Sequence, residues 1–158
     1  PAQPDFKTRF ALAELNFQLK QYLEASKNYQ LASEQSTDPS LKHNAHYGAL
    51  FSLEKYIETE KLDDKKKKQF QEAQLKLALA YVVGFPKGEH IEEVRLQSAL
   101  LTYTLGQVDE AVKITEGFFK PTFKKKENNI RAEDLYLDLL NHQKKYTELQ
   151  KQAEKFKE

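Results

Sequence analysis

A nine-residue pattern occurs four times in the chain, and it constrains the fold more than any other feature of the sequence. Its copies begin at Phe17, Phe51, Tyr103 and Asn141, so successive copies start 34, 52 and 38 residues apart. Every copy has Glu at the eighth place, and the sixth place is Tyr in three copies and Val in one. A period in this range is typical of helical repeats that stack into an array.

The composition agrees with a helical fold and excludes several classes of protein. Only five Gly and five Pro occur, which argues against an all-β fold with many tight turns. The formal charge is +1, so no global field would attract the chain to nucleic acid or to an anionic membrane. The absence of Cys excludes disulfides, thiolate metal sites and a cysteine nucleophile.

The first residues of the chain and its apolar stretches indicate whether it is processed and whether it could cross a membrane. It opens at Pro1 without Met or a signal-like segment, which indicates a processed chain or a piece of a longer protein. Its charge-free stretches are shorter than the roughly 20 residues that cross a bilayer. We therefore expect a soluble chain that does not insert into a membrane, with any anchor outside it.

Apolar residues at helical spacing predict eight helices in four antiparallel hairpins. The predicted helices span about 5–20, 22–34, 40–60, 66–83, 89–105, 108–119, 128–142 and 146–157. They form repeat units 4–38, 39–86, 87–121 and 126–158 within one domain, 1–158. The lysine-rich segment 61–68 is interpreted as an exposed insertion that lengthens the link to the fourth helix, or the start of that helix.

Small residues recur where paired helices would touch. Ala25, Tyr29 and Ala32 share one helix face, and Ala73, Leu77 and Ala80 repeat that stripe in the fourth helix. The pattern predicts that six alanines are buried at helix contacts: Ala25, Ala32, Ala73, Ala80, Ala99 and Ala111.

These positions resemble the tetratricopeptide repeat family. The first unit matches the family pattern at Ala13, Tyr22, Ala25, Tyr29, Ala32 and Pro39, and the third at Ala99, Val108, Ala111 and Pro121. The second unit fits only with its lysine-rich insertion, and the fourth has Leu149 where Ala is expected. The resemblance covers nearly the whole chain and implies a right-handed superhelical array of about four repeats. It says little about function, because such arrays bind many unrelated partners.

In the family, one side of each first helix lines a concave groove that binds partners. Carried over by position, the predicted binding residues are Phe10, Glu14, Phe17, Asn44, Phe51, Leu96, Leu100, Tyr103, Arg131 and Asp138. Two interpretations of the aromatic residues at 17, 51 and 103 stay open. They line the groove, or they pack between repeats as core and the register is one residue out.

No residue pattern indicates catalysis. His43 and His46 have a spacing that a metal could use, but without Cys or a nearby acid we interpret them as ordinary surface or capping histidines. Adjacent carboxylates such as Glu92 and Glu93 point apart on a helix, and no phosphate-binding loop or zinc-protease motif occurs. We therefore expect neither enzymatic activity nor a metal or cofactor.

The predicted function is protein–protein interaction through the concave face, with a peptide or a segment of another protein as the partner. The alternative is a structural subunit of a larger assembly, in which the array ends stack on further repeats or on other copies. The segment 38–47 is similar to repeat starts in bacterial envelope proteins of the family. This similarity suggests a periplasmic or cell-envelope location.

Overall fold

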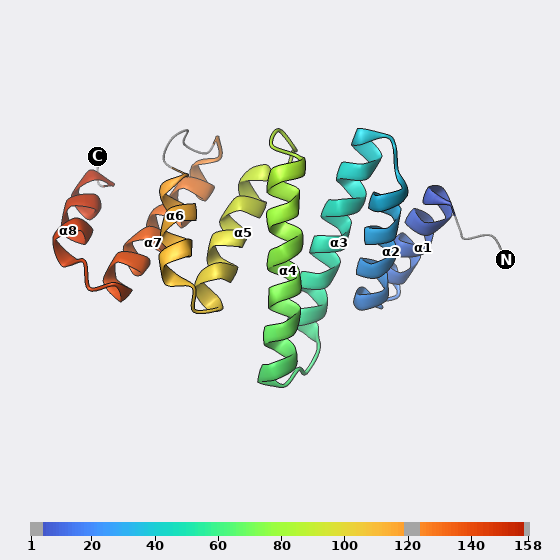
Figure 1. The fold of residues 1–158 in the computed structure, drawn as a ribbon, viewed down its shortest axis with the longest axis horizontal. Helices are drawn as coiled ribbons and strands as arrows, with labels where there is room; N and C mark the ends of the chain where they lie inside the picture. The colour runs from blue at the N-terminus through green and yellow to red at the C-terminus, as the bar shows by residue number, and fades with distance from the viewer. Residues whose placement is uncertain (1–4, 119–123, 157–158) are drawn as a thin grey trace. The chain divides into compact units, whose positions relative to one another are not determined.

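The computed structural model describes residues 5–118 and 124–156. Within these ranges all regular secondary structure is α-helical, which confirms the predicted all-α class (Figure 1). The chain divides into two compact units, Pro1–His90 and Ile91–Glu158. The first unit contains α1 (Phe6–Gln18), α2 (Tyr22–Gln35), α3 (Pro39–Thr59) and α4 (Asp64–Gly84). The second contains α5 (Ile91–Thr104), α6 (Val108–Glu116), α7 (Lys126–His142) and α8 (Tyr146–Lys155).

Three helices of the first unit begin at an aspartate that caps the helix. The Asp5 carboxylate accepts a hydrogen bond from the Thr8 amide at 2.8 Å, and Asp63 accepts one from Lys66 at 2.8 Å. Asp38 accepts from two amides at the start of α3 and is followed by Pro39. A side-chain acceptor at this position satisfies amides that have no partner inside the helix, and so fixes where the helix starts.

Three of the four hairpins turn in the same way. Between their helices the middle residue of the link has a positive φ: 60° at Lys20, 81° at Gly106 and 56° at Lys144. Paired backbone hydrogen bonds close each turn, and in the first they run from Lys20 N to Phe17 O and from Gln21 N to Asn16 O. This is the Schellman arrangement that ends many helices. The repeated sequence pattern therefore encodes the turn itself in its first, third and fourth copies.

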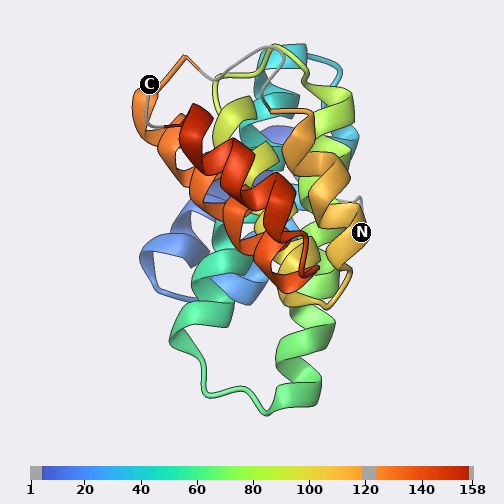
Figure 2. The same ribbon diagram turned by 90° about the vertical axis from the view of Figure 1, so that its left-hand side faces the viewer.

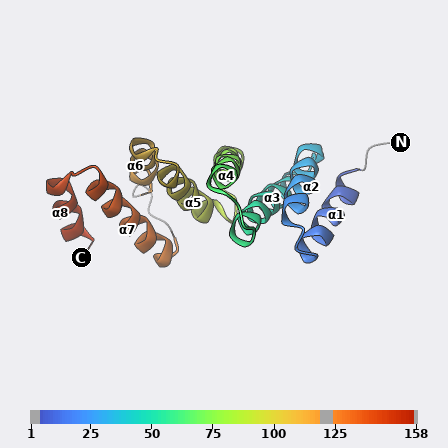
Figure 3. The ribbon, with the colours of Figure 1, turned by 90° about the horizontal axis from the view of Figure 1, so that it is seen from below.

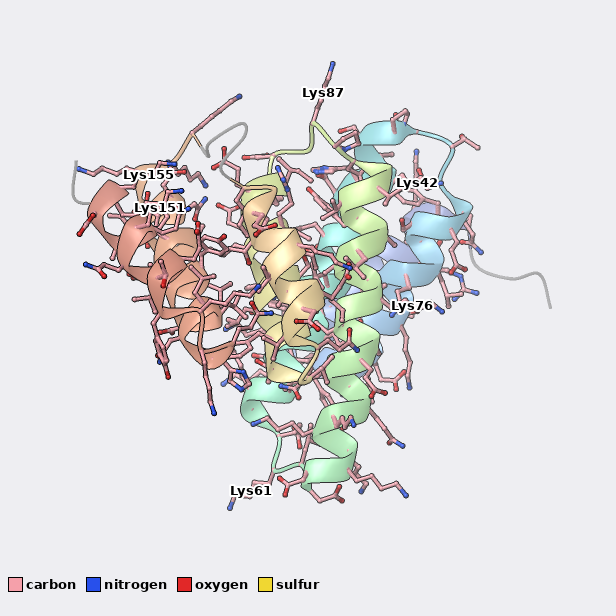
Figure 4. All side chains as sticks on the ribbon, turned by 60° about the vertical axis from the view of Figure 1, so that its left-hand side comes forward. Lys42, Lys61, Lys76, Lys87, Lys151 and Lys155 are labelled. Atoms are coloured by element: carbon pink, nitrogen blue, oxygen red, sulfur yellow. The ribbon has the colours of Figure 1, made fainter. Side chains whose placement is uncertain are left out.

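The second copy of the pattern forms no turn. Phe51 to Thr59 continues as helix to the end of α3, and Tyr56 packs edge-on against Phe70 of α4 with ring centroids 4.9 Å apart. Both helices of this hairpin therefore run past the point at which the other hairpins reverse. Figure 2 shows the connecting loop at the far end of the first unit, and Figure 4 shows Lys61 pointing outward from it. The segment 61–68 is thus a loop plus the first residues of α4.

One part of the core of the first unit lies where α2 packs against both α1 and α3 (Figure 3). It is built from small residues around one tyrosine: Ala13, Ala25, Tyr29, Ala32, Ala45 and Ala49. Alanines let the helix backbones approach closely, and Gly48 has the same role. A Cβ atom at Gly48 would lie 2.9 Å from the Tyr29 ring. Burial of Ala25 and Ala32 agrees with the repeat pattern.

The predicted buried face of α4 is wrong. Ala73 and Ala80 are exposed, and the buried residues of this helix are Gln74, Leu75, Ala78 and Tyr81. The stripe predicted from spaced alanines is displaced because Tyr81 is fully buried and sets which side of α4 meets α3. Alanine favours a helix whether it is buried or exposed, so its spacing alone does not identify the packed face.

The core cluster of the second unit contains larger apolar side chains than the alanine cluster of the first. Its buried residues include Leu96, Ala99, Ala111, Val112, Phe118, Leu135, Leu139 and Leu140. Burial of Ala99 and Ala111 matches the repeat pattern, whereas the predicted stop at Pro121 lies outside the described residues. No helix in the described part of the chain is both long and apolar enough to cross a bilayer.

Candidate functional site

A hollow of about 240 Å³ lies between α5 and α7 in the second unit. It is lined by Leu96, Leu100, Arg131, Asp134, Leu135 and Asp138. Leu96 and Leu135 are buried and form its floor, while Leu100 is 47% exposed at its edge. Arg131, Asp134 and Asp138 are exposed, so charged groups surround an apolar base.

Helical spacing brings these side chains together. Leu96 and Leu100 are one turn apart on α5, and the four residues from α7 recur at steps of three and four along one face. The residues around the hollow therefore come from two neighbouring helix faces. Side chains placed on helices are held more precisely than side chains on loops.

Glu92 of α5 forms hydrogen bonds with residues at the start of α7. Its carboxylate accepts hydrogen bonds from the Lys124 amide at 2.7 Å, the Lys125 amide at 3.3 Å and the Asn128 side chain at 3.2 Å. Burial raises the pKa of Glu92, but these hydrogen bonds outweigh it and hold that pKa below its usual value. The ionised carboxylate thus ties the residues just before α7, and the Asn128 side chain in its first turn, to α5, whereas the N-cap residue of α7 makes no side-chain capping bond.

Four of the predicted binding residues meet at this hollow, namely Leu96, Leu100, Arg131 and Asp138. A fifth, Tyr103, lies half-buried further along α5. Its ring meets His142 of α7 edge-on, with centroids 5.8 Å apart. The repeat register therefore identifies one continuous face of the second unit.

In the first unit, the predicted aromatic pair also comes together. Phe17 of α1 and Phe51 of α3 stack with ring centroids 5.6 Å apart, and both are half-buried. Phe17 contacts the alanine-rich core on its other side. The residue before each aromatic is the one that is buried, Asn16 in α1 and Leu50 in α3. The rings therefore cover the core and keep an exposed edge.

The remaining predicted residues of the first unit have different surroundings. Phe10 packs edge-on against Tyr29 with centroids 5.4 Å apart. The Tyr29 hydroxyl donates to the Glu14 carboxylate, and burial together with this carboxylate raises the pKa of Tyr29. Asn44 is exposed and lies 3.2 Å from the His43 ring nitrogen Nδ1. Glu14 is thus engaged within the unit, whereas Asn44 is exposed and lines a hollow between the start of α3 and the loop after α4.

The stacked rings of Phe17 and Phe51 continue into an aromatic row, formed with Tyr47 and His90, that the sequence pattern did not predict. Tyr47 stacks on Phe51 with centroids 6.3 Å apart, and the His90 ring stacks on Tyr47 at 3.6 Å. His43, Tyr47 and Phe51 follow one another by single helical turns of α3. That spacing, read as one face, is the signal that would have revealed the row.

The two histidines of α3 bind to α4. The His43 Nε2 atom hydrogen-bonds the Tyr81 hydroxyl, and the His46 Nε2 atom is 2.9 Å from the Leu77 carbonyl oxygen. Both side chains are half-buried and connect α3 to α4, so they are not the ordinary surface or capping histidines that the sequence predicted. No group of three or more His, Asp or Glu side chains in residues 5–118 and 124–156 is placed to hold a metal ion.

A second hollow, of about 680 Å³, lies between the start of α3 and the loop after α4. Residues on its walls include Ser40, His43, Phe85 and Gly88. A Cβ atom at Gly88 would lie 2.7 Å from both His43 Nε2 and the Tyr81 hydroxyl, so glycine permits the loop to approach them. No sequence motif indicates this hollow, because it depends on the path of the loop.

The His46 contact predicts a pH dependence of stability. Burial lowers the pKa of His46, and this effect exceeds the opposing effect of the hydrogen bond to Leu77. As the pH falls below about 6.5, the unfolded chain takes up a proton that the folded chain resists. We therefore expect the free energy of unfolding of the first unit to keep its full value above that pH and to decrease as the pH is lowered further. Urea denaturation of the wild type and of His46→Gln between pH 7.5 and 5 measures this pH dependence. If the free energy of unfolding changes equally with pH in both proteins, the prediction is wrong.

Comparisons with protein-family models, with curated proteins and with solved structures each found no match for this chain. Membership of the tetratricopeptide repeat family therefore stays a prediction. The proposed function rests on the helix faces and hollows of the two units.

Proposed function

We propose that this chain is a non-catalytic protein-interaction module, similar to tetratricopeptide repeat arrays, that binds a peptide segment of another protein. The observation that carries the proposal is the hollow between α5 and α7. It combines an apolar floor with a charged rim, and four of its lining residues are those that the repeat register assigns to the binding face. Peptide sites of this kind anchor an apolar side chain and orient it with surrounding polar groups.

The charged residues around the hollow indicate which kind of peptide would bind there. Two carboxylates, Asp134 and Asp138, and one guanidinium, Arg131, surround the exposed edge of Leu100. A peptide with an aliphatic or aromatic anchor and at least one basic neighbour satisfies both the floor and the carboxylates. The aromatic row in the first unit offers a second apolar surface of the same general kind. A periplasmic or cell-envelope location remains part of the proposal.

A change at Leu100 tests this function. Because Leu100 is about half exposed, Leu100→Glu should leave the fold intact while placing a third carboxylate at the apolar edge. Peptides are first selected on the wild-type chain from a random display library, and their affinities are then measured by calorimetry. We expect the substitution to weaken binding by roughly tenfold or more, as at an interface anchor.

Leu79→Glu is the matched control. Leu79 is 42% exposed on α4 of the first unit, so it has a similar exposure but does not line the hollow. It should leave both the affinity and the melting temperature unchanged. Failure to select any peptide, or equal losses from the two substitutions, would rule out this site.

A further inference from the structure

A histidine lies at one end of the face that α5 and α7 form around their hollow. His142 is the last residue of α7, and it is exposed. Its ring meets the Tyr103 ring of α5 edge-on, with centroids 5.8 Å apart. Tyr103 follows Leu100, which lines the hollow, by three residues on α5. The contact with Tyr103 therefore holds the His142 ring on the same side of the two helices as the hollow.

Asp138 of the hollow lies one helical turn before His142. Side chains four residues apart on a helix are neighbours, with Cβ atoms about 5–6 Å apart. Asp134, which also lines the hollow, lies one turn further back. Within residues 5–118 and 124–156, none of the ion pairs involves Asp134 or Asp138. Both carboxylates are therefore available to a basic residue of a bound peptide.

Only the fourth copy of the repeated sequence pattern places a titratable group at this position. The residues equivalent to His142 are Gln18, Ser52 and Thr104, which are neutral at every ordinary pH. Histidine is the side chain that changes its charge between about pH 5 and 8. The C-terminal end of a helix also favours a positive charge, because its carbonyl groups point outward there. The second unit thus carries a group that titrates next to Asp138.

Protonation of His142 would change the charge around the hollow. The charged residues that line it are Arg131, Asp134 and Asp138, which together carry one negative charge. An imidazolium at His142 brings that sum to zero. The positive ring would attract the Asp138 carboxylate and repel a basic side chain of the peptide, since both lie within a few ångströms of it.

The other charged groups near His142 keep their charge in this pH range. The α5 residues on this face, Leu96, Leu100 and Tyr103, are uncharged. In the link to α8, Lys144 and Lys145 stay positive. On the two other helices that pack against α7, Asp109 of α6 accepts from the Gln143 side chain, and Glu148 of α8 acts on Tyr136. Carboxylates titrate near pH 4 and lysines near pH 10, so His142 is the group that changes.

We propose that protonation of His142 weakens the binding of a basic peptide at the hollow between α5 and α7. The site then releases its peptide as the pH falls from about 7.5 to 5.5. This inference rests on the proposed function and adds a mode of regulation to the same site. Because coupling between two binding events is reciprocal, a bound basic peptide also makes the His142 ring harder to protonate.

Affinities at two pH values test the proposal. The probe is a peptide selected on the wild-type chain at pH 7.5 that contains Lys or Arg and no His. Calorimetry at pH 7.5 and 5.5 should show binding to the wild type weaken by about two- to fivefold, the effect of one partly exposed charge. His142→Gln should bind equally at both pH values, and His142→Lys should bind weakly at both. His142 is exposed, so melting temperatures should match the wild type.

His46→Gln is the matched control, because His46 lies in the first unit and titrates away from the hollow. It should keep the wild-type pH dependence of binding. NMR titration of the His142 ring should show its midpoint move to lower pH when the peptide is bound. Equal wild-type affinities at both pH values, or an unchanged pH dependence in His142→Gln, would overturn this inference and leave the proposed function standing. Absence of any binding at pH 7.5 would overturn both.

Discussion

Replacing Tyr81 with Ala is expected to lower the free energy of unfolding of the first unit by about 3–5 kcal/mol. Tyr81 is fully buried, and its ring contacts His43, His46 and Phe85 at centroid distances of 5.3, 5.8 and 5.2 Å. The substitution removes this ring and also leaves the His43 nitrogen without the hydroxyl that it bonds. Urea denaturation followed by amide NMR signals from each unit gives the value.

Tyr81→Phe is the control that separates ring from hydroxyl. It keeps the packing and removes only the hydrogen bond to His43, so the expected loss is about 1 kcal/mol. Signals from the second unit should change little in either variant. A Tyr81→Ala loss no larger than the Tyr81→Phe loss would mean that the ring is not part of the core of the first unit.

Replacing Ala25 with Leu is expected to destabilise the first unit by about 1–3 kcal/mol. Ala25 is fully buried among Ala13, Tyr29, Ala45 and Ala49, where α1, α2 and α3 meet. Three added carbon atoms would push apart backbones that the small residues allow to approach. The same denaturation experiment measures the change.

Ala73→Leu is the matched control for Ala25→Leu. The alanine spacing predicts that both positions are buried, whereas the structure leaves Ala73 exposed on α4. The control should therefore change the free energy of unfolding by no more than about 0.5 kcal/mol. If Ala73→Leu destabilises as much as Ala25→Leu, the corrected face of α4 is wrong.

The helices and their order could be predicted because several local signals agree. Apolar spacing, capping aspartates and turn residues all indicate the same boundaries, and the observed helix ends lie close to the predicted ones. The backbone conformation of the turns was harder to predict from the sequence. Gly106 indicates a positive φ by its residue type, but Lys20 and Lys144 adopt the same conformation with a side chain that normally disfavours it.

The geometry of the proposed binding face could be predicted only in part. The repeat register brought Leu96, Leu100 and Asp138 to one hollow, because positions one helical turn apart share a face in any straight helix. It did not show that the Phe17 and Phe51 rings stack on each other with their edges exposed. Nor did it reveal the contact between His90 and Tyr47, which depends on the path of the loop after α4. Such contacts arise from tertiary packing, for which a single sequence carries no periodic signal.

The two ends of the long hairpin formed by α3 and α4 differ in how strongly tertiary packing stabilises them. No residue from Glu54 to Ala73 is buried, and the packed rings of Tyr56 and Phe70 are only half-buried, so tertiary packing supports the helical hydrogen bonds of this stretch less than those nearer the core. Opening that end exposes almost no core, whereas opening the stretch around Leu50 and Tyr81 exposes fully buried side chains. We therefore expect amide hydrogens of the outer stretch to exchange with solvent through local opening, and those of the inner stretch to exchange only when the whole unit unfolds. The outer end is thus expected to unfold and refold locally while the rest of the hairpin stays folded.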